Sequence, residues 1–154
     1  LSEINLLLEI VLFFCMKIYN LLNYIKDSNI YNKKYYWQLM KIYHNPRCSK
    51  SRETLKIILD NDIKPDIHLY LENPLSIEEI KYILKLLDTS PENIVRKNED
   101  VYKILDLKNA NKDMLIKMIH ENPILLERPI VISKNQAILG RPPENVKQLI
   151  TNKS

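Results

Sequence analysis

The sequence has few cysteines and few histidines. Among its 154 residues are two cysteines, Cys15 and Cys48, and three histidines. Two cysteines do not build a disulfide framework, so we expect a reduced, cytoplasmic protein. With so few thiol and imidazole ligands, we also expect no metal site and no bound cofactor.

The chain has no segment in which charges of one sign are concentrated. The 23 basic and 19 acidic residues give a net charge of +4, but the two signs are interleaved. Because a dense basic arm is missing, nucleic-acid binding is not expected. The apolar fraction of 45% suffices for a core, and a chain of this length normally forms one domain. No heptad or repeated apolar stripe stands out, so a monomer is expected.

Residues 1–39 differ from the rest of the chain. The run LLLEIVLFFCMKIYNLLNYI is interrupted by Glu9 and Lys17, which leaves it too short to span a membrane. It also lacks the basic start and small-residue cleavage site of a signal peptide. We expect residues 1–39 to be an N-terminal extension, namely upstream sequence translated in frame, with Met40 the natural start. The alternative is an amphipathic segment on a membrane surface, and the intact mass of the native protein would distinguish the two.

The stretch after Met40 predicts a strand, a helix and a second strand. KIYH (41–44) has strand character and stops at an Asn-Pro turn signal. Ser49 or Ser51 is placed to cap the helix that follows. PDIHLYL (65–71) alternates in polarity, with Ile67, Leu69 and Leu71 as its apolar positions. This order within about thirty residues is typical of two parallel strands joined by a helix.

The remainder predicts helices followed by a hairpin. LSIEEIKYILKLLD (75–88) opens with Ser76 and Glu79 in a capping box, and NKDMLIKMIHEN (111–122) is a second amphipathic helix. PIVIS and QAILG read as two strands around a Lys134-Asn135 turn, before a last helix that starts on proline. The expected fold is α/β, a four-stranded mixed sheet flanked by helices.

Cys48 is the candidate reactive residue. It directly precedes the first predicted helix, whose free backbone N–H groups and dipole favour a thiolate. Arg47, Lys50 and Arg52 are sequence neighbours, and His44 ends the preceding strand. The alternative is an inert, buried cysteine. Ser51 stands where a CxxC motif would have its second sulfur, so Cys48 has no partner for an internal disulfide.

Three arginines lie at the ends of predicted elements. Arg96 follows a short helical turn, Arg128 precedes Pro129 at the start of a strand, and Arg141 follows Gly140 at the end of the hairpin. Guanidinium groups that converge would bind a tetrahedral oxyanion through forked, charged donors. Their spacing alone does not show that they converge.

Several motifs, in order, resemble the glutaredoxin-coupled arsenate reductase family, the ArsC family. They are IYHNPRCSKSRETL, YLENPLS, VRKN, HENPILLERPIVI and LGRPPE, and the likeness runs from residue 40 to about 150. It implies a thioredoxin-like fold with a helical insertion for residues 40–154. It further implies that Cys48 is the nucleophile and that Arg96, Arg128 and Arg141 bind the oxyanion. His44 matches the histidine near the nucleophile, and Arg128-Pro129 would be a cis peptide.

The resemblance implies reduction of arsenate to arsenite through a covalent Cys48–arsenate adduct. Glutathione would be the reductant, and glutaredoxin would clear the mixed disulfide. Two alternatives stay open. One is a thiol oxidoreductase acting on glutathionylated substrates. The other is a regulator of the Spx type that binds RNA polymerase. Ser51 removes the CxxC switch of such regulators, and Arg141 keeps an anion site that they would not need, so both residues favour the enzyme.

Overall fold

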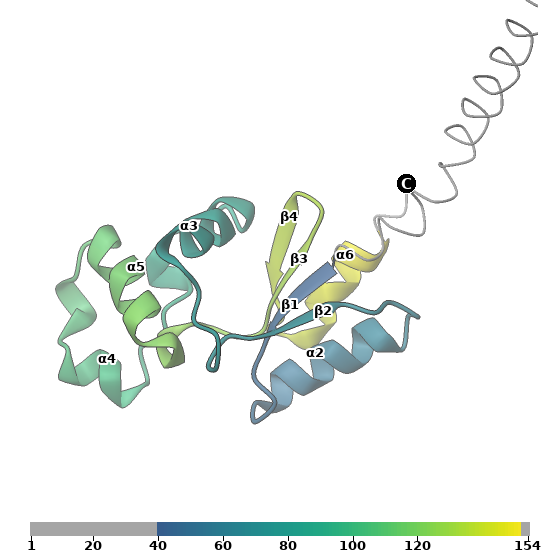
Figure 1. Cartoon of the computed structure of the whole chain (residues 1–154), viewed down its shortest axis with the longest axis horizontal. Coiled ribbons are helices and arrows are strands. Elements are labelled where there is room, and N and C mark those ends of the chain that lie inside the picture. Colours follow the sequence, from purple (N-terminus) through teal and green to yellow (C-terminus); the bar gives the residue numbers. More distant parts are fainter. Residues whose placement is uncertain (1–39, 152–154) are drawn as a thin grey trace, which may run out of the picture. The chain divides into compact units, whose positions relative to one another are not determined.

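The computed structural model describes residues 40–151, and a four-stranded mixed sheet lies at their centre (Figure 1). The strand order is β2-β1-β3-β4. The bounds are β1 Met40–His44, β2 Asp66–Leu69, β3 Ile130–Ser133 and β4 Gln136–Leu139. β1 and β2 are parallel, whereas β3 is antiparallel to both β1 and β4. The predicted sheet is confirmed, and the predicted extension at residues 1–39 lies outside the described residues.

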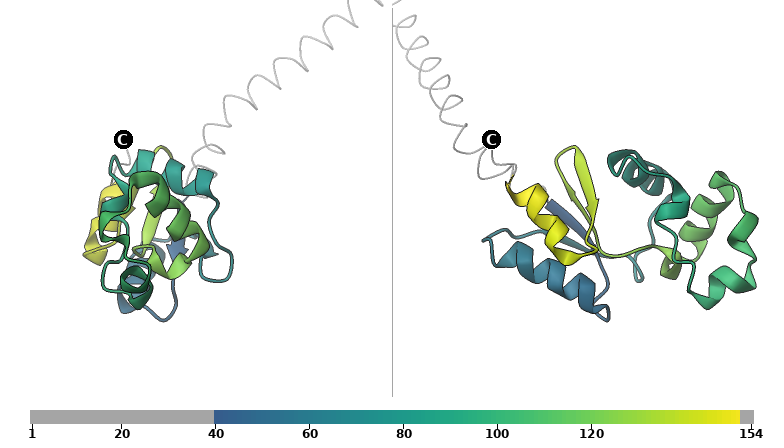
Figure 2. Two further views of the ribbon diagram at one scale, coloured as in Figure 1. Left: turned by 90° about the vertical axis from the view of Figure 1, so that its left-hand side faces the viewer. Right: turned by 180° about the vertical axis from the view of Figure 1, so that it is seen from behind.

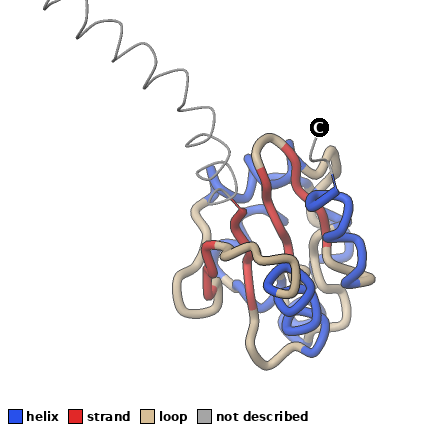
Figure 3. The backbone as a smooth tube through the Cα atoms, turned by 90° about the vertical axis from the view of Figure 1, so that its right-hand side faces the viewer, coloured by secondary structure: helices blue, strands red, loops and turns tan. Residues whose placement is uncertain are grey.

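Helices lie on both sides of this sheet. Figure 1 shows α2 and α6 together on one side of the strands and α3, α4 and α5 grouped on the other side, and the views of Figure 2 agree. Figure 3 shows the four strands side by side between these helices. The helical bounds are α2 Ser49–Leu59, α3 Ile77–Leu86, α4 Asp100–Ile104, α5 Lys112–Glu121 and α6 Lys147–Thr151. No helix within residues 40–151 is long and apolar enough to cross a bilayer.

Helix α2 begins differently from the sequence-based prediction. Its N-cap residue is Cys48, in an extended conformation, and no side chain caps the helix. The hydroxyl of Ser51 is fully buried instead, where it accepts a 3.0 Å hydrogen bond from the Asn45 backbone N–H and lies 2.8 Å from His44 Nδ1. The prediction of a serine cap was wrong because Ser51 ties the helix to the end of β1.

The predicted second strand is present as β2, although two of its three apolar positions are exposed. Ile67 and Leu71 are 45% and 39% exposed, whereas Tyr70 is fully buried. β2 ends at Leu69, and a turn follows in which the Leu69 carbonyl accepts from the N–H groups of Glu72 and Asn73. Tyr70 directly follows the strand, and its side chain joins the core.

The insertion between β2 and β3 is helical, as expected. Ser76 and Glu79 form the predicted capping box at the start of α3, with the Ser76 N–H donating to Glu79 Oε2 at 2.8 Å. α3 and α5 pack on each other and bury their apolar faces in one core with β1 and β3. One-turn helices connect the longer elements, namely η2 Pro91–Asn93, η3 Leu107–Asn109, η4 Pro123–Leu125 and η5 Pro143–Val146.

Gly140, the single glycine of the chain, is required by close packing. A Cβ atom at this position would lie 2.7 Å from both Pro129 Cγ and Thr54 Oγ1. Neither neighbour is the far end of a flexible side chain, so the backbone would have to shift. We expect Gly140→Ala to lower the free energy of unfolding by about 1–3 kcal/mol, measured by urea denaturation. A change below about 0.5 kcal/mol would contradict this role.

Candidate active site

Strand pairing brings the predicted site residues to one end of the sheet. Tyr43 of β1 pairs with Ile130 of β3, so the segment after β1 lies beside Arg128. Ile130 pairs with Leu139 of β4, and the Gly140 N–H donates to the Pro129 carbonyl at 2.8 Å. Arg141 therefore follows β4 at the point where β3 begins. The peptide bonds Arg128-Pro129 and Arg141-Pro142 are both cis, of which the first was predicted.

Arg96 reaches the same place through a short antiparallel bridge. Val95 pairs with Leu126, the Arg96 N–H donates to the Leu125 carbonyl at 2.7 Å, and the Glu127 N–H donates to the Ile94 carbonyl at 2.8 Å. This bridge joins two segments some thirty residues apart in sequence.

The Cys48 sulfur lies at the start of α2 and is partly exposed. The loop before the helix is held by a 3.0 Å hydrogen bond from the Cys48 N–H to the Asn45 carbonyl. Arg141 Nη2 approaches Cys48 Sγ to 3.9 Å. A guanidinium and the N-terminal end of an 11-residue helix thus both lie next to Cys48.

Two carboxylates join the three arginines into one network. Glu99 pairs with Arg96 and lies 3.7 Å from Arg128 Nη1. Glu127 Oε2 lies 3.2 Å from Arg141 Nε and 4.0 Å from Arg96 Nε. The predicted convergence is therefore present, although only Arg141 contacts Cys48 directly.

This network keeps partly buried charges together. The side chains of Arg96 and Arg128 are 20% and 11% exposed, and both carboxylates are 24% exposed. Three guanidiniums this close would repel one another without counter-charges. Glu99 and Glu127 offset two of the three positive charges, which leaves one net positive charge to attract an anion.

His44 lies beside this cluster but hydrogen-bonds Ser51 rather than the sulfur. Burial lowers the pKa of His44 below its ordinary value of 6.5, the Arg52 charge lowers it further, and the hydrogen bond with Ser51 acts in the opposite direction. A neutral imidazole that holds Ser51 fixes the start of α2. The direct catalytic role implied for His44 by the family resemblance stays a prediction.

The lowered pKa of His44 predicts a pH dependence of stability. The unfolded chain takes up the proton at a higher pH than the folded chain. The contribution of His44 to stability is therefore full above about pH 6.5 and is lost as the pH falls below that value. We expect an NMR titration midpoint for His44 below 6.5 that moves upward in Arg52→Gln. A midpoint at or above 6.5 would contradict burial of the neutral ring.

The other histidines have local partners. His68 Nε2 lies 2.7 Å from the Asn73 carbonyl, and His120 Nδ1 lies 2.7 Å from the Leu75 carbonyl. His120 thus ties α5 to the segment before α3. Among residues 40–151, no group of three or more His, Cys, Asp and Glu side chains is placed to hold a metal ion.

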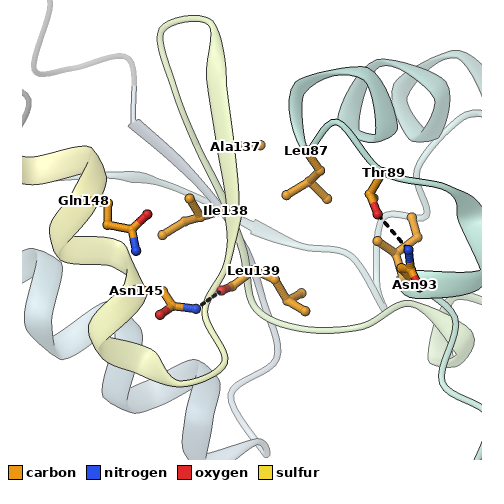
Figure 4. A pocket seen from close by; sticks show the side chains of 9 residues that line it. Leu87, Thr89, Asn93, Ala137, Ile138, Leu139, Asn145 and Gln148 are labelled. Atoms are coloured by element: carbon orange, nitrogen blue, oxygen red, sulfur yellow. Dashed lines mark hydrogen bonds between the residues drawn. The ribbon is translucent and has the colours of Figure 1, made fainter.

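A shallow pocket lies elsewhere, between β4, η5 and the segment from Leu87 to Ile94 (Figure 4). Two hydrogen bonds order its rim, from Asn93 to Thr89 and from Asn145 to the Leu139 carbonyl. None of its lining residues belongs to the arginine network or contacts Cys48. The pocket is therefore separate from the site around Cys48.

Sequence reasoning missed the roles of Glu99 and Tyr70. Glu99 stands three residues after Arg96, and this spacing on a turn was a readable signal for an ion pair. Glu127 lies close to Arg96 and Arg141, which are distant in sequence, so no local spacing signalled its role. No local pattern signalled the burial of Tyr70.

Comparison with known proteins places this arrangement in a family. The model described as the ArsC family matches residues 43–149. The chain belongs to the ArsC family. An arsenate reductase of Haemophilus influenzae is 43% identical over 112 residues, which cover 71% of this chain and 97% of that protein. The uncharacterized protein YfgD of Escherichia coli is 44% identical over 114 residues, covering 72% of this chain and 96% of that protein.

Solved structures of this family share the fold. A putative arsenate reductase from Yersinia pestis superposes with a TM-score of 0.68 at 44% identity, covering 71% of this chain and 98% of that one. An arsenate reductase from Vibrio cholerae gives a TM-score of 0.69 at 42% identity, covering 71% and 95%. The thioredoxin-like fold of this ArsC protein agrees with the prediction from its motifs.

Proposed function

We propose that this ArsC-family protein reduces arsenate to arsenite, with glutathione and glutaredoxin as external thiols. The observation that carries the proposal is the Arg141 guanidinium 3.9 Å from Cys48 Sγ, within a network of three arginines. Relatives named arsenate reductase, 43% and 40% identical to this chain, support the choice of oxyanion.

In the first step the Cys48 thiolate attacks the arsenic of bound arsenate. A sulfur–arsenic bond forms and one arsenate oxygen leaves as water after protonation. Arg96, Arg128 and Arg141 hold the remaining oxygens and offset the negative charge that develops on them. Phosphate has the same shape and charge as arsenate, so the ability of sulfur to react with arsenic supplies much of the discrimination.

The second step needs a thiol from outside the described chain. Ser51 occupies the position of a resolving cysteine, and Cys48 is the only cysteine within residues 40–151. Glutathione attacks the Cys48 sulfur, the sulfur–arsenic bond breaks, and its electron pair stays on arsenic, which leaves as arsenite. The two thiols supply the two electrons and become a mixed disulfide, which glutaredoxin reduces by thiol exchange.

The direct test is arsenite formation by the full chain with arsenate, glutathione and glutaredoxin. We expect turnover that requires all three, and no product when phosphate replaces arsenate. Absence of arsenite, with glutaredoxin active in a control reaction, would overturn the proposal. Reduction of a glutathionylated peptide without arsenate would then favour a thiol oxidoreductase.

A further inference from the structure

Tyr70 has a buried hydroxyl at the end of the sheet that holds the site. Its side chain is fully buried. β1 and β2 are parallel with His44 opposite Leu69, so Tyr70 lies level with Asn45, at the start of the Cys48 loop. The electrostatic surroundings of its hydroxyl include Arg128, Asn45 and Cys48. Tyr70, which directly follows the edge strand β2, thus lies near Arg128 of the arginine network.

The Tyr70 hydroxyl has no hydrogen-bond partner among residues 40–151. Asn45 and Arg128 lie near it, but neither contact attains hydrogen-bond geometry. Arg128 Nε is likewise buried without a partner. Burying polar groups without partners disfavours folding, and such groups in native proteins call for an explanation. Here the unpaired Tyr70 hydroxyl has Arg128, whose Nε is also unpaired, among its near neighbours.

The Tyr70 hydroxyl is suited to donate rather than to accept. Burial raises its pKa above the ordinary value of 10.0, and the Cys48 charge also raises it, while Arg128 and Asn45 act in the opposite direction. The phenol thus keeps its proton near neutral pH. A neutral donor adds a hydrogen bond to an anion without a further charge in a site that already holds three guanidiniums.

We propose that Tyr70 binds the tetrahedral oxyanion by donating its hydroxyl hydrogen to one oxygen, beside Arg128 Nε. The inference deepens the proposed function and rests on it only for the identity of the anion, since arsenate and phosphate present the same oxygens. It makes Tyr70 a binding residue of the site.

Tyr70→Phe tests this role because it removes only the hydroxyl. We expect the concentration of inorganic phosphate that protects Cys48 from iodoacetamide to rise about tenfold or more, and kcat/KM for arsenate to fall by a similar factor. The thermal midpoint should stay the same or rise, because the buried hydroxyl has no partner to lose. A purely structural tyrosine would not show these opposite effects.

Tyr43→Phe is the matched control. Tyr43 is also a buried tyrosine of this core, but its neighbours are Glu79 and Asp66 rather than the arginines. We expect phosphate protection and kcat/KM in Tyr43→Phe to stay within about twofold of the wild type. Comparing Tyr70→Phe with Tyr43→Phe distinguishes the loss of a hydrogen-bond donor in the anion site from the loss of a buried tyrosine hydroxyl elsewhere in the core.

The outcomes separate this inference from the proposed function. If the wild type forms no arsenite, yet phosphate protects Cys48 and Tyr70→Phe weakens that protection, the proposed function fails and Tyr70 still binds the anion. Protection in Tyr70→Phe within twofold of the wild type would overturn the inference, as would no protection of the wild type by phosphate or arsenate. Weaker protection together with a thermal midpoint lower than that of Tyr43→Phe would also overturn it, because the hydroxyl would then be structural.

Discussion

Replacing Cys48 with serine is expected to abolish arsenite formation, with kcat/KM at least about 1,000-fold below the wild type. In the proposed mechanism the sulfur bonds to arsenic and is then attacked by glutathione. A serine hydroxyl is not ionised near neutral pH and cannot form the mixed disulfide whose formation leaves the electron pair on arsenic. The measurement is initial-rate arsenite formation with saturating glutathione and glutaredoxin.

The matched control for Cys48→Ser is the same substitution at the other cysteine of the chain, Cys15. Cys15 lies outside the described residues, and we expect turnover of Cys15→Ser within about twofold of the wild type. The thermal midpoint of Cys48→Ser should stay near that of the wild type, since Cys48 is partly exposed and packs little surface. Turnover in Cys48→Ser above about one-tenth of the wild type would contradict its assignment as the nucleophile.

The second large effect is expected from Arg128→Lys, with kcat/KM for arsenate falling about 100-fold or more. The guanidinium of Arg128 is almost fully buried, and its Nη1 lies 3.7 Å from Glu99 and 3.4 Å from the Ile124 carbonyl. Lysine keeps the charge, and thus the pairing with Glu99, but loses the planar fork and the buried Nε donor. The fall in kcat/KM therefore measures the loss of forked hydrogen bonds to the anion rather than a loss of net charge.

Arg47→Lys is the control for this substitution. Arg47 is exposed and adjacent to Cys48 in sequence, and lysine preserves its charge. We expect kcat/KM within about twofold of the wild type, because an exposed charge contributes through its long-range field. Equal losses in Arg47→Lys and Arg128→Lys would show that the forked geometry of Arg128 is not required.

Local sequence patterns predicted the elements well. The capping box at Ser76 and Glu79, the hairpin around Lys134 and the parallel pair of strands each depend on residues close in sequence. Cys48 could be singled out for the same reason, since the helix start and its neighbouring cations are local features. Such signals are readable because the interactions that produce them span only a few residues.

Which residues meet in the site depends on contacts between segments distant in sequence, and local patterns do not predict these contacts. Arg96 meets Glu127 only because Val95 and Leu126 form an isolated bridge. Tyr70 is buried because it joins a core to which residues distant in sequence contribute. The family motifs indicated the three arginines, but the carboxylates that join them and the buried phenol beside them required the fold.

The most direct test of the account is a single-turnover reaction without glutaredoxin. The full chain is mixed with arsenate and glutathione, and arsenite and Cys48-bound glutathione are measured together. We predict one arsenite and one glutathione per protein molecule, with the modification confined to Cys48 and absent when phosphate replaces arsenate. Addition of glutaredoxin should restart turnover. Continued arsenite formation without glutaredoxin, or arsenite formed with Cys48 left unmodified, would contradict the proposed route.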